Sequence, residues 1–263
     1  MSVKQVTSTA NTDIKAMRAL DMRKERRETG LFLAEGLRHV LEGIDNHWTL
    51  TTLAYHWKIA QKPEVARARD ACVKAGGTCL EVNDLVLEKL SHKDNPQQVI
   101  GVFRQRLVAL KDMSARKCIV ALDQVRDPGN LGTIIRTVDA VGADGIILID
   151  QCCDPFSTEA VRASMGSLFA VPIAQALKVD FKAFVKDWKG TVIGTHLSDK
   201  TVDYRAVKYN APTLLVMGNE QAGLSDDIAS ILPTLVKLPM HGRADSLNLA
   251  IATGVMLYKI NEA

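Results

Sequence analysis

The chain has 263 residues, with 33 basic and 30 acidic side chains and a formal net charge of +3. Apolar residues make up 47% and charged residues 24%, the shares of an ordinary globular protein, which excludes a wholly disordered, collagen-like or coiled-coil chain. No apolar run approaches the ~18 residues of a membrane span, and the first residues lack the apolar core of a secretory signal. We therefore expect a cytoplasmic protein that does not enter a membrane.

Cysteine and histidine usage argues against metal chemistry. The five cysteines contain no C-x-x-C pair, and the six histidines show no metal-ligand spacing, so we expect neither a disulfide framework nor a bound metal. The adjacent Cys152 and Cys153 could form a redox pair, but two buried small side chains are the better interpretation.

The first hundred residues alternate between helical and extended patterns. A helix is expected from Asp13 to Arg27, with Gly30 just beyond it. The elements expected next are a strand at 31–34, a helix at 37–44, a strand at 49–55, a helix at 62–75 and strands at 79–82 and 99–103. This alternation predicts an α/β layer domain at residues 12–106, followed by a linker at 107–116.

Basic side chains gather in the first predicted helix. The members of this cluster are Arg23, Lys24, Arg26 and Arg27. Such a cluster can bind RNA phosphates, or it can be a solvated helix face, because acidic residues are interleaved with it. Charge alone favours the solvated face.

Residues 117–263 alternate in the same way. Strands are expected at 118–122, 145–149, 191–195, 213–217 and 235–238, with a helix at about 131–141 and a terminal helix at 247–258. The strand at 118–122 is entirely apolar, which is typical of a parallel sheet covered on both faces. Functional loops in such sheets lie at the carboxyl ends of the strands.

Three loops of this second part carry unusual polar residues. They span 130–136, 217–225 and 238–250. Singly, each has an ordinary explanation as a helix cap or a turn, and the common phosphate-binding glycine motifs are absent.

Together the three loops resemble the SpoU/TrmH family of the SPOUT class of RNA methyltransferases. The first matches N-x-G-x-x-x-R at Asn130, Gly132 and Arg136. The second matches G-N-E-x-x-G-[LIM] from Gly218 to Leu224, and the third matches [IL]-P-M…S-L-N from Leu238 onward. Residues 154–166 are also similar to the family, and residues 23–36 resemble the substrate-binding domain often fused ahead of it, which is like certain small ribosomal proteins.

The resemblance implies a specific architecture and cofactor. The C-terminal domain, residues 117–263, would be an α/β SPOUT domain with a deep trefoil knot, an exception to the rule that folds are unknotted. It would bind S-adenosylmethionine in the knot and act as a homodimer. The residues that would hold the cofactor are Thr195, Gly218, Asn219, Leu238, Met240 and Leu247.

The resemblance also implies the reaction, methyl transfer to a ribose 2′-hydroxyl in RNA. Arg136 would be the central catalytic residue, drawn in the family as a base; because a guanidinium stays charged, we prefer an electrostatic role. Asn130, Ser246 and Asn248 would orient the reacting groups. Glu220 would orient Arg136 catalytically or pair with it structurally, and Arg126 could contact RNA phosphate or be solvated.

The fused N-terminal domain favours ribosomal RNA over transfer RNA as the substrate. Two alternatives stay open: a transfer RNA methyltransferase of the same family, and a non-catalytic RNA-binding or assembly protein with this fold. The second is disfavoured because every polar motif residue is present. The tryptophans at 48, 57 and 188 could stack on bases, but we expect them to pack against the protein.

Overall fold

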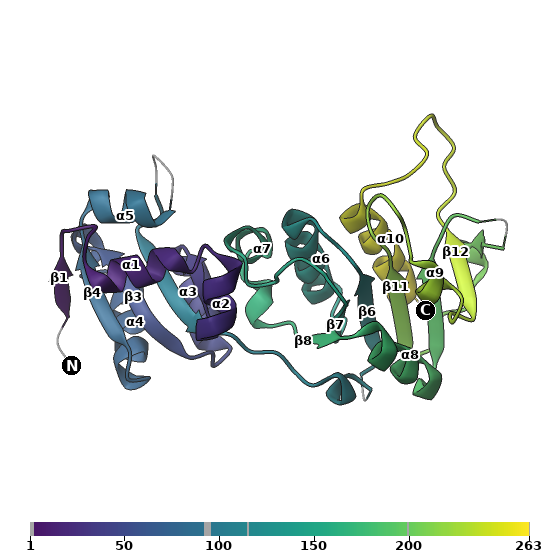
Figure 1. The fold of residues 1–263 in the computed structure, drawn as a ribbon, viewed down its shortest axis with the longest axis horizontal. Helices are drawn as coiled ribbons and strands as arrows, with labels where there is room; N and C mark the ends of the chain where they lie inside the picture. The colour runs from purple at the N-terminus through teal and green to yellow at the C-terminus, as the bar shows by residue number, and fades with distance from the viewer. Residues whose placement is uncertain (1–2, 92–95, 115, 199, 263) are drawn as a thin grey trace. The chain divides into compact units, whose positions relative to one another are not determined.

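The computed structural model describes residues 3–91, 96–114, 116–198 and 200–262. These form two compact α/β units (Figure 1). Unit 1 comprises Met1–Arg106 and Asp154–Ala170, and unit 2 comprises Leu107–Cys153 and Val171–Ala263. The chain therefore passes between the units three times, and the segment 154–170, which our sequence-based division put with the C-terminal domain, packs with unit 1.

Unit 1 is built on a five-stranded sheet in the order β1-β4-β3-β5-β2. Its strands are β1 (Lys4–Val6), β2 (Leu31–Glu35), β3 (Leu50–His56), β4 (Thr78–Val82) and β5 (Val99–Arg104). Its helices are α1 (Thr12–Ala19), α2 (Arg23–Thr29), α3 (Leu37–Asp45), α4 (Pro63–Lys74), α5 (Asp84–Ser91) and α7 (Thr158–Ala163). Strands β1, β4 and β3 are parallel, whereas β5 runs antiparallel to both β3 and β2. The carboxyl ends of β2, β3 and β4 therefore lie at the same edge of the sheet as the start of β5.

The single helix expected over 13–27 is two helices. Asn11, not Asp13, caps α1, since its Oδ1 accepts hydrogen bonds from the N–H groups of Asp13 and Ile14 at 2.8 and 3.4 Å. The break follows Leu20, and the guanidinium of Arg26 bonds the carbonyls of Leu20 and Asp21 at 2.8 and 2.9 Å. These bonds satisfy backbone groups that a continuous helix would have paired internally.

The segment 154–170 is held in unit 1 by aromatic packing. The ring of Phe32 on β2 lies 5.0 Å from that of Phe156 and 6.0 Å from that of Phe169. Trp48 lies edge-on to Phe169 at 5.3 Å and donates its indole N–H to the Phe169 carbonyl at 2.9 Å. A hydrogen bond of 3.0 Å between Arg162 on α7 and Glu35 at the end of β2 adds a polar contact.

Unit 2 is a seven-stranded parallel sheet in the order β10-β12-β9-β11-β6-β7-β8. Its strands are β6 (Cys118–Asp123), β7 (Gly145–Ile149), β8 (Ile173–Ala176), β9 (Thr191–Thr195), β10 (Val202–Asp203), β11 (Thr213–Met217) and β12 (Thr234–Lys237). Its helices are α6 (Pro128–Ala140), α8 (Lys178–Asp187), α9 (Asp226–Ala229) and α10 (Leu249–Asn261). The central strands are buried along their whole length, as their apolar sequences predict.

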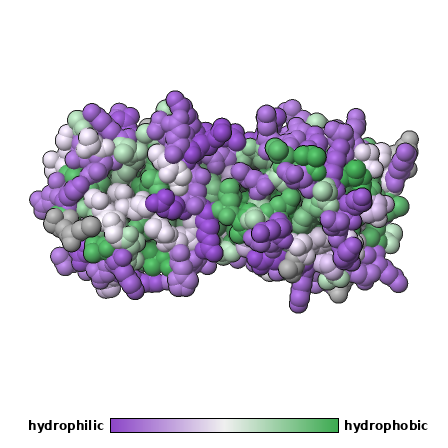
Figure 2. All heavy atoms as spheres, turned by 60° about the horizontal axis from the view of Figure 1, so that its bottom comes forward, coloured by the Kyte–Doolittle hydropathy of each residue, from purple (hydrophilic) through white to green (hydrophobic). Residues whose placement is uncertain are grey.

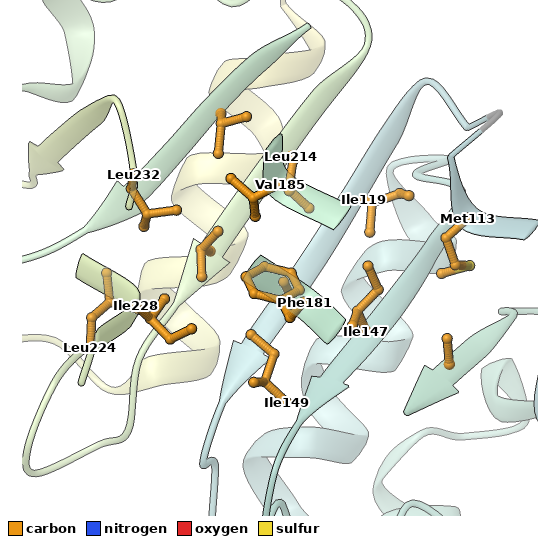
Figure 3. Close-up of a cluster of buried hydrophobic side chains, with 14 residues drawn as sticks. Met113, Ile119, Ile147, Ile149, Phe181, Val185, Leu214, Leu224, Ile228 and Leu232 are labelled. Atoms are coloured by element: carbon orange, nitrogen blue, oxygen red, sulfur yellow. The ribbon is translucent and has the colours of Figure 1, made fainter. Parts of the chain in front are cut away.

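Successive residues of these strands face opposite sides of the sheet. Figure 3 shows one side, where Phe181 of α8 lies over the strands that carry Ile119, Ile147 and Leu214. On the other side lie α6 and α10, which pack against each other and contact β7 and β11 respectively. The sheet is thus covered by helices on both faces, and its carboxyl edge is the place where polar loops can gather.

The surface gives little guidance to function by hydropathy alone. Hydrophilic and hydrophobic residues are interspersed over the face drawn in Figure 2, and neither unit presents a uniform area there. None of the described helices is long and apolar enough to cross a membrane. Within the described residues, no group of three or more His, Cys, Asp or Glu side chains is placed to hold a metal ion.

Candidate active site

A cavity of about 380 Å³ opens at the carboxyl edge of the unit 2 sheet. Three loops line it: those that follow β9, β11 and β12, with the start of α10. A volume in this range suits a small-molecule cofactor. The lining residues include all six that the resemblance assigned to the cofactor, namely Thr195, Gly218, Asn219, Leu238, Met240 and Leu247.

The loop after β11 is closed on itself. Asn219 and Gly223 exchange backbone hydrogen bonds of 2.8 and 3.0 Å, and Gly223 has a φ of +69°. The side-chain oxygen of Asn219 accepts from the N–H groups of Gln221 and Ala222 at 2.9 and 3.2 Å. A Cβ at Gly218 would lie 2.1 Å from the carbonyl carbon of Gly223, so only glycine fits there. The Asn219 side chain therefore shapes the cavity wall from within the loop.

The end of β6 fastens this loop at two points. Asp123, only 1% exposed, accepts hydrogen bonds through Oδ2 from the backbone N–H and the hydroxyl of Ser225, at 2.9 and 2.7 Å. The carbonyl of Gln124 accepts from Nδ2 of Asn219 at 2.8 Å. Hydrogen bonds to a buried carboxylate are stronger than neutral ones, so Asp123 fixes the loop where it leads into α9.

A hydrogen-bonded chain of two side-chain amides and one carboxylate, which we call the amide chain, joins the three motif loops. Nδ2 of Asn248 donates to Oδ1 of Asn130 at 2.9 Å, and Nδ2 of Asn130 donates to Oε1 of Glu220 at 3.3 Å. Asn248 also caps α10, because its Oδ1 accepts from the N–H groups of Ala250 and Ile251 at 2.9 and 3.3 Å. Asn130 and Asn248, which are 118 positions apart in the sequence, are thus in contact beside the cavity.

The other predicted catalytic residues lie around the amide chain. Ser246 lines the cavity and is exposed. Arg136 lies on α6, six residues after Asn130, exposed and without a hydrogen bond or ion pair to any described residue. The ion pair that we considered between Glu220 and Arg136 is therefore not formed within the described chain, and Glu220 bonds Asn130 instead.

Cysteine chemistry is disfavoured here by the surroundings of the thiols. Burial, and to a smaller extent the negative charges of Glu220 and Asp127, raises the pKa of Cys153 to about 12. Burial likewise raises the pKa of Cys152 to about 11. Both thiols are therefore protonated near neutral pH and are poor nucleophiles.

The predicted RNA-contacting residues divide into two kinds. Arg23, Lys24, Arg27 and Arg126 are exposed. Arg26 is 4% exposed, and its Nε donates to Oδ2 of Asp154 at 2.7 Å while its Nη1 bonds two backbone carbonyls. Because Arg26 is buried and its guanidinium is engaged with Asp154 and the backbone, we leave it out of the proposed RNA contacts.

Sequence reasoning missed the residues that support the site from behind. The sequence assigned no role to Asp123 or Gln124, and Ser225 was only the last residue of the loop 217–225. The available signal was the acidic residue that ends a fully apolar strand, since a carboxylate buried there needs a partner. His196 and Asp245, which also line the cavity, carry no pattern in the sequence that distinguishes them from surface residues.

The chain matches two protein-family models. Residues 117–258 match the model described as the SpoU rRNA methylase family. Residues 11–101 match the MRM3-like substrate binding domain. The first match covers the seven-stranded sheet of unit 2, the residues that line the cavity and all three motif loops.

Relatives resemble the chain over nearly its whole length. A 23S rRNA (guanosine(2553)-2'-O)-methyltransferase from Bacillus subtilis is 30% identical over 98% of this chain and 99% of its own. A 23S rRNA (uridine(2479)-2'-O)-methyltransferase from Streptomyces viridochromogenes is 32% identical over 91% of this chain and 85% of its own. The AdoMet-bound rRNA methyltransferase from Sinorhizobium meliloti superposes with a TM-score of 0.93 at 48% identity, covering 99% of this chain and 98% of that one.

These matches confirm the predicted fold class, cofactor and enzyme class. The two matched ranges include the substrate-binding sequence and the motif-bearing sequence that the resemblance identified. The chain belongs to the SpoU family of S-adenosylmethionine-dependent RNA methyltransferases.

Proposed function

We propose that the protein transfers a methyl group from S-adenosylmethionine to a ribose 2′-hydroxyl of 23S ribosomal RNA. The observation that carries this proposal is the amide chain from Asn248 through Asn130 to Glu220, which assembles three distant loops beside one cofactor-sized cavity. The relatives that match nearly end to end are named for this reaction on 23S rRNA, which favours that RNA over transfer RNA.

The cavity suits S-adenosylmethionine. Leu238, Met240 and Leu247 offer accessible apolar surface for an adenine ring, and the close packing of Gly218 on Gly223 holds backbone polar groups in place along the wall. Glu220 and Asp245 add carboxylates that can face an ammonium group. We assign the cofactor to the loops that carry Thr195, Gly218, Asn219, Leu238, Met240 and Leu247, where it supplies an electrophilic methyl group.

The protein's own contribution is to align and activate the ribose hydroxyl. This hydroxyl is a weak acid, so it reacts faster where a cation favours the alkoxide form. Arg136 is suited to that role because its guanidinium is always charged and has no partner among the described residues. Asn130 and Asn248 are held rigidly by their mutual hydrogen bond, and with Ser246 they orient the substrate.

We infer that the active enzyme is a homodimer. Helix α10 exposes Ile251, Val255 and Tyr258, which lie on one face at helical spacing. With Thr133 and Thr137 of α6 they line a shallow groove of about 620 Å³, a surface that a second copy could cover. Arg136 is on the same helix as the two threonines and does not line the cavity of its own chain, so a partner's cavity is where we expect it to act.

We propose RNA contacts in each unit: Arg23, Lys24 and Arg27 on α2 of unit 1, and Arg126 before α6 of unit 2, all of which are exposed. A 23S rRNA substrate is consistent with a cytoplasmic enzyme. The ranges of the two family models support a substrate-binding domain at 12–106 and a catalytic domain within 117–263, except for the segment 154–170, which packs with unit 1. The trefoil knot remains a prediction.

A transfer assay tests the proposed function. Tritiated S-adenosylmethionine is offered with unmodified 23S rRNA or with unmodified transfer RNA, and the RNA is digested to nucleosides. We expect a labelled 2′-O-methylnucleoside from 23S rRNA alone. Label confined to transfer RNA, or label on a base, would overturn the proposal.

A further inference from the structure

Trp57 differs from the other two tryptophans in its surroundings. Trp48 packs among phenylalanine rings with its indole N–H bonded to Phe169, and Trp188 packs on Phe184 with its N–H 3.3 Å from the Pro212 carbonyl. Trp57 is 54% exposed, and its indole N–H has no acceptor among the described residues. The expectation that the tryptophans pack against the protein is confirmed for the first two, whereas Trp57 contacts the His56 ring and leaves more than half of its side chain exposed.

The position of Trp57 in unit 1 is that of a binding residue. It opens a 3-10 turn (Trp57–Ile59) directly after β3, at the edge where β2, β3 and β4 end and β5 begins. The backbone confirms that the neighbouring loops meet there: the N–H of Gly36 bonds the Val99 carbonyl at 2.8 Å, and the N–H of His56 bonds the Gln98 carbonyl at 2.9 Å. Ligands of α/β sheets bind outside the carboxyl ends of strands.

One side of the Trp57 ring lies against the buried ring of His56. His56, which is 1% exposed, has its ring centroid 5.6 Å from that of Trp57. Its Nδ1 accepts from the N–H of Lys58 at 3.2 Å, and its Nε2 lies 3.2 Å from Oδ1 of Asp84 at the start of α5. Trp57 therefore has a buried ring behind it on one side, while more than half of its side chain is exposed.

Positive charge lies beside the ring. Nζ of Lys58 is 5.5 Å from the Trp57 ring centroid, within the range of a cation–π contact, and 4.0 Å from Oδ2 of Asp84, an exposed pair from which a phosphate can draw the lysine. Arg38 is exposed in the first turn of α3, which begins at the same edge. An exposed aromatic face with a cation beside it is the arrangement that binds single-stranded nucleic acid, in which bases stack and phosphates pair with Lys or Arg.

We propose that Trp57 is a stacking platform for an unpaired base of the RNA substrate, with Lys58 beside it for the neighbouring phosphate. The platform lies in the part of the chain that matches a substrate-binding domain. It is separate from the basic residues of α2, which precede β2 and so lie toward the opposite edge of the sheet. The inference rests on the proposed function only in taking RNA as the ligand.

The test compares RNA binding by full-length variants at one salt concentration. The probe is unmodified 23S rRNA made by transcription, with transfer RNA measured in parallel. We expect Trp57→Ala to weaken binding by about 5-fold to about 150-fold, the range for losing one stacked base, and Trp57→Phe to retain most of the affinity. Leu85→Ala is the matched control, because Leu85 is 59% exposed at the same edge and cannot stack.

Three further measurements separate stacking from damage to the fold. S-adenosylmethionine affinity and Tm should be unchanged in Trp57→Ala, and wild-type indole emission should fall when RNA binds, a change that Trp57→Phe should lack. RNA affinity of Trp57→Ala within twofold of wild type, or an equal loss in Leu85→Ala, would overturn the proposal. If the wild type binds transfer RNA but not 23S rRNA, the proposed function fails, and the same variants test stacking on transfer RNA.

Discussion

The side-chain amide of Asn248 donates a hydrogen bond to the side-chain oxygen of Asn130, at 2.9 Å. Asn248 caps the last helix, and Asn130 lies in the first turn of α6, whose N-cap is Asp127. Each asparagine is therefore fixed by a helix start as well as by the other. Because the Glu220 carboxylate can only accept, Asn130 turns its amide nitrogen to Glu220 and its oxygen to Asn248.

Replacing Asn130 by alanine should reduce methyl transfer far more than cofactor binding. The change removes both contacts of the amide chain while leaving the cavity lining intact. We expect the single-turnover rate at saturating S-adenosylmethionine to fall by ~10²-fold to ~10³-fold, as for the loss of one oriented polar group in an active site. Cofactor affinity measured by calorimetry should change by less than about threefold, about 0.7 kcal/mol; a larger loss would assign Asn130 to the cofactor site.

Gly218→Val should abolish cofactor binding. Any Cβ at this position meets the backbone of Gly223 and Leu224 at 2.1 to 2.4 Å, and backbone atoms cannot move aside without opening the loop. Gly242→Ala is the control, since a Cβ there has nothing within 4 Å and the residue lies in the loop that follows β12. Calorimetry should show no binding by the first variant and wild-type binding by the second. Retained binding by Gly218→Val would mean that this loop is not the cofactor site.

Ser225→Ala should weaken cofactor binding without contacting the cofactor. The variant loses the 2.7 Å hydrogen bond from the hydroxyl to buried Asp123, while the backbone N–H of residue 225 still bonds the carboxylate. A hydrogen bond to a charged group contributes about 1.5–3 kcal/mol, and we expect part of it to appear as a roughly tenfold higher Kd. Ser230→Ala removes an exposed hydroxyl bonded only to the Asp227 carbonyl and should leave the Kd unchanged.

Arg26 and Arg27 are adjacent in the sequence, but their replacement by alanine should affect the free energy of unfolding very differently. Arg26→Ala leaves Asp154 without its partner in a pair whose side chains are 5% and 13% exposed, and such losses cost about 3–5 kcal/mol of folding free energy. Arg27→Ala should change the free energy of unfolding by less than about 0.5 kcal/mol, since the side chain is exposed. Urea denaturation measures both. Equal stability of the two variants would contradict a structural role for Arg26.

The fold could be predicted where the local pattern and the tertiary packing agree. Apolar strands such as 118–122 and 213–217 were expected at their correct places because fully buried strands are apolar throughout. Helix α5 was missed although Asn83 precedes it, its Oδ1 bonded to the Val86 N–H at 3.0 Å as a cap. The break after Leu20 could not be predicted, because it depends on Arg26 bonding the carbonyls at 20 and 21.

The candidate site also has features that could be predicted from the sequence and features that could not. The motif residues Asn130, Glu220 and Asn248 could be selected from the sequence, and their proximity follows from the parallel sheet. The pairing of Glu220 with Asn130 rather than with Arg136 could not, since it depends on side-chain reach across 90 positions of chain. The membership of 154–170 in unit 1 also escaped prediction, because the contacts of Phe156 and Phe169 are with rings far away in the sequence.

The most direct test of the account is the methylation rate of Arg136→Ala, measured in single turnovers on 23S rRNA at saturating S-adenosylmethionine. Arg136 has no partner to lose among the described residues, so its removal should leave the fold and the cofactor affinity unchanged. The account predicts that methyl transfer falls by at least ~10³-fold while calorimetry shows wild-type cofactor binding. A variant that still methylates 23S rRNA at near the wild-type rate would contradict the assignment of Arg136 as the catalytic cation.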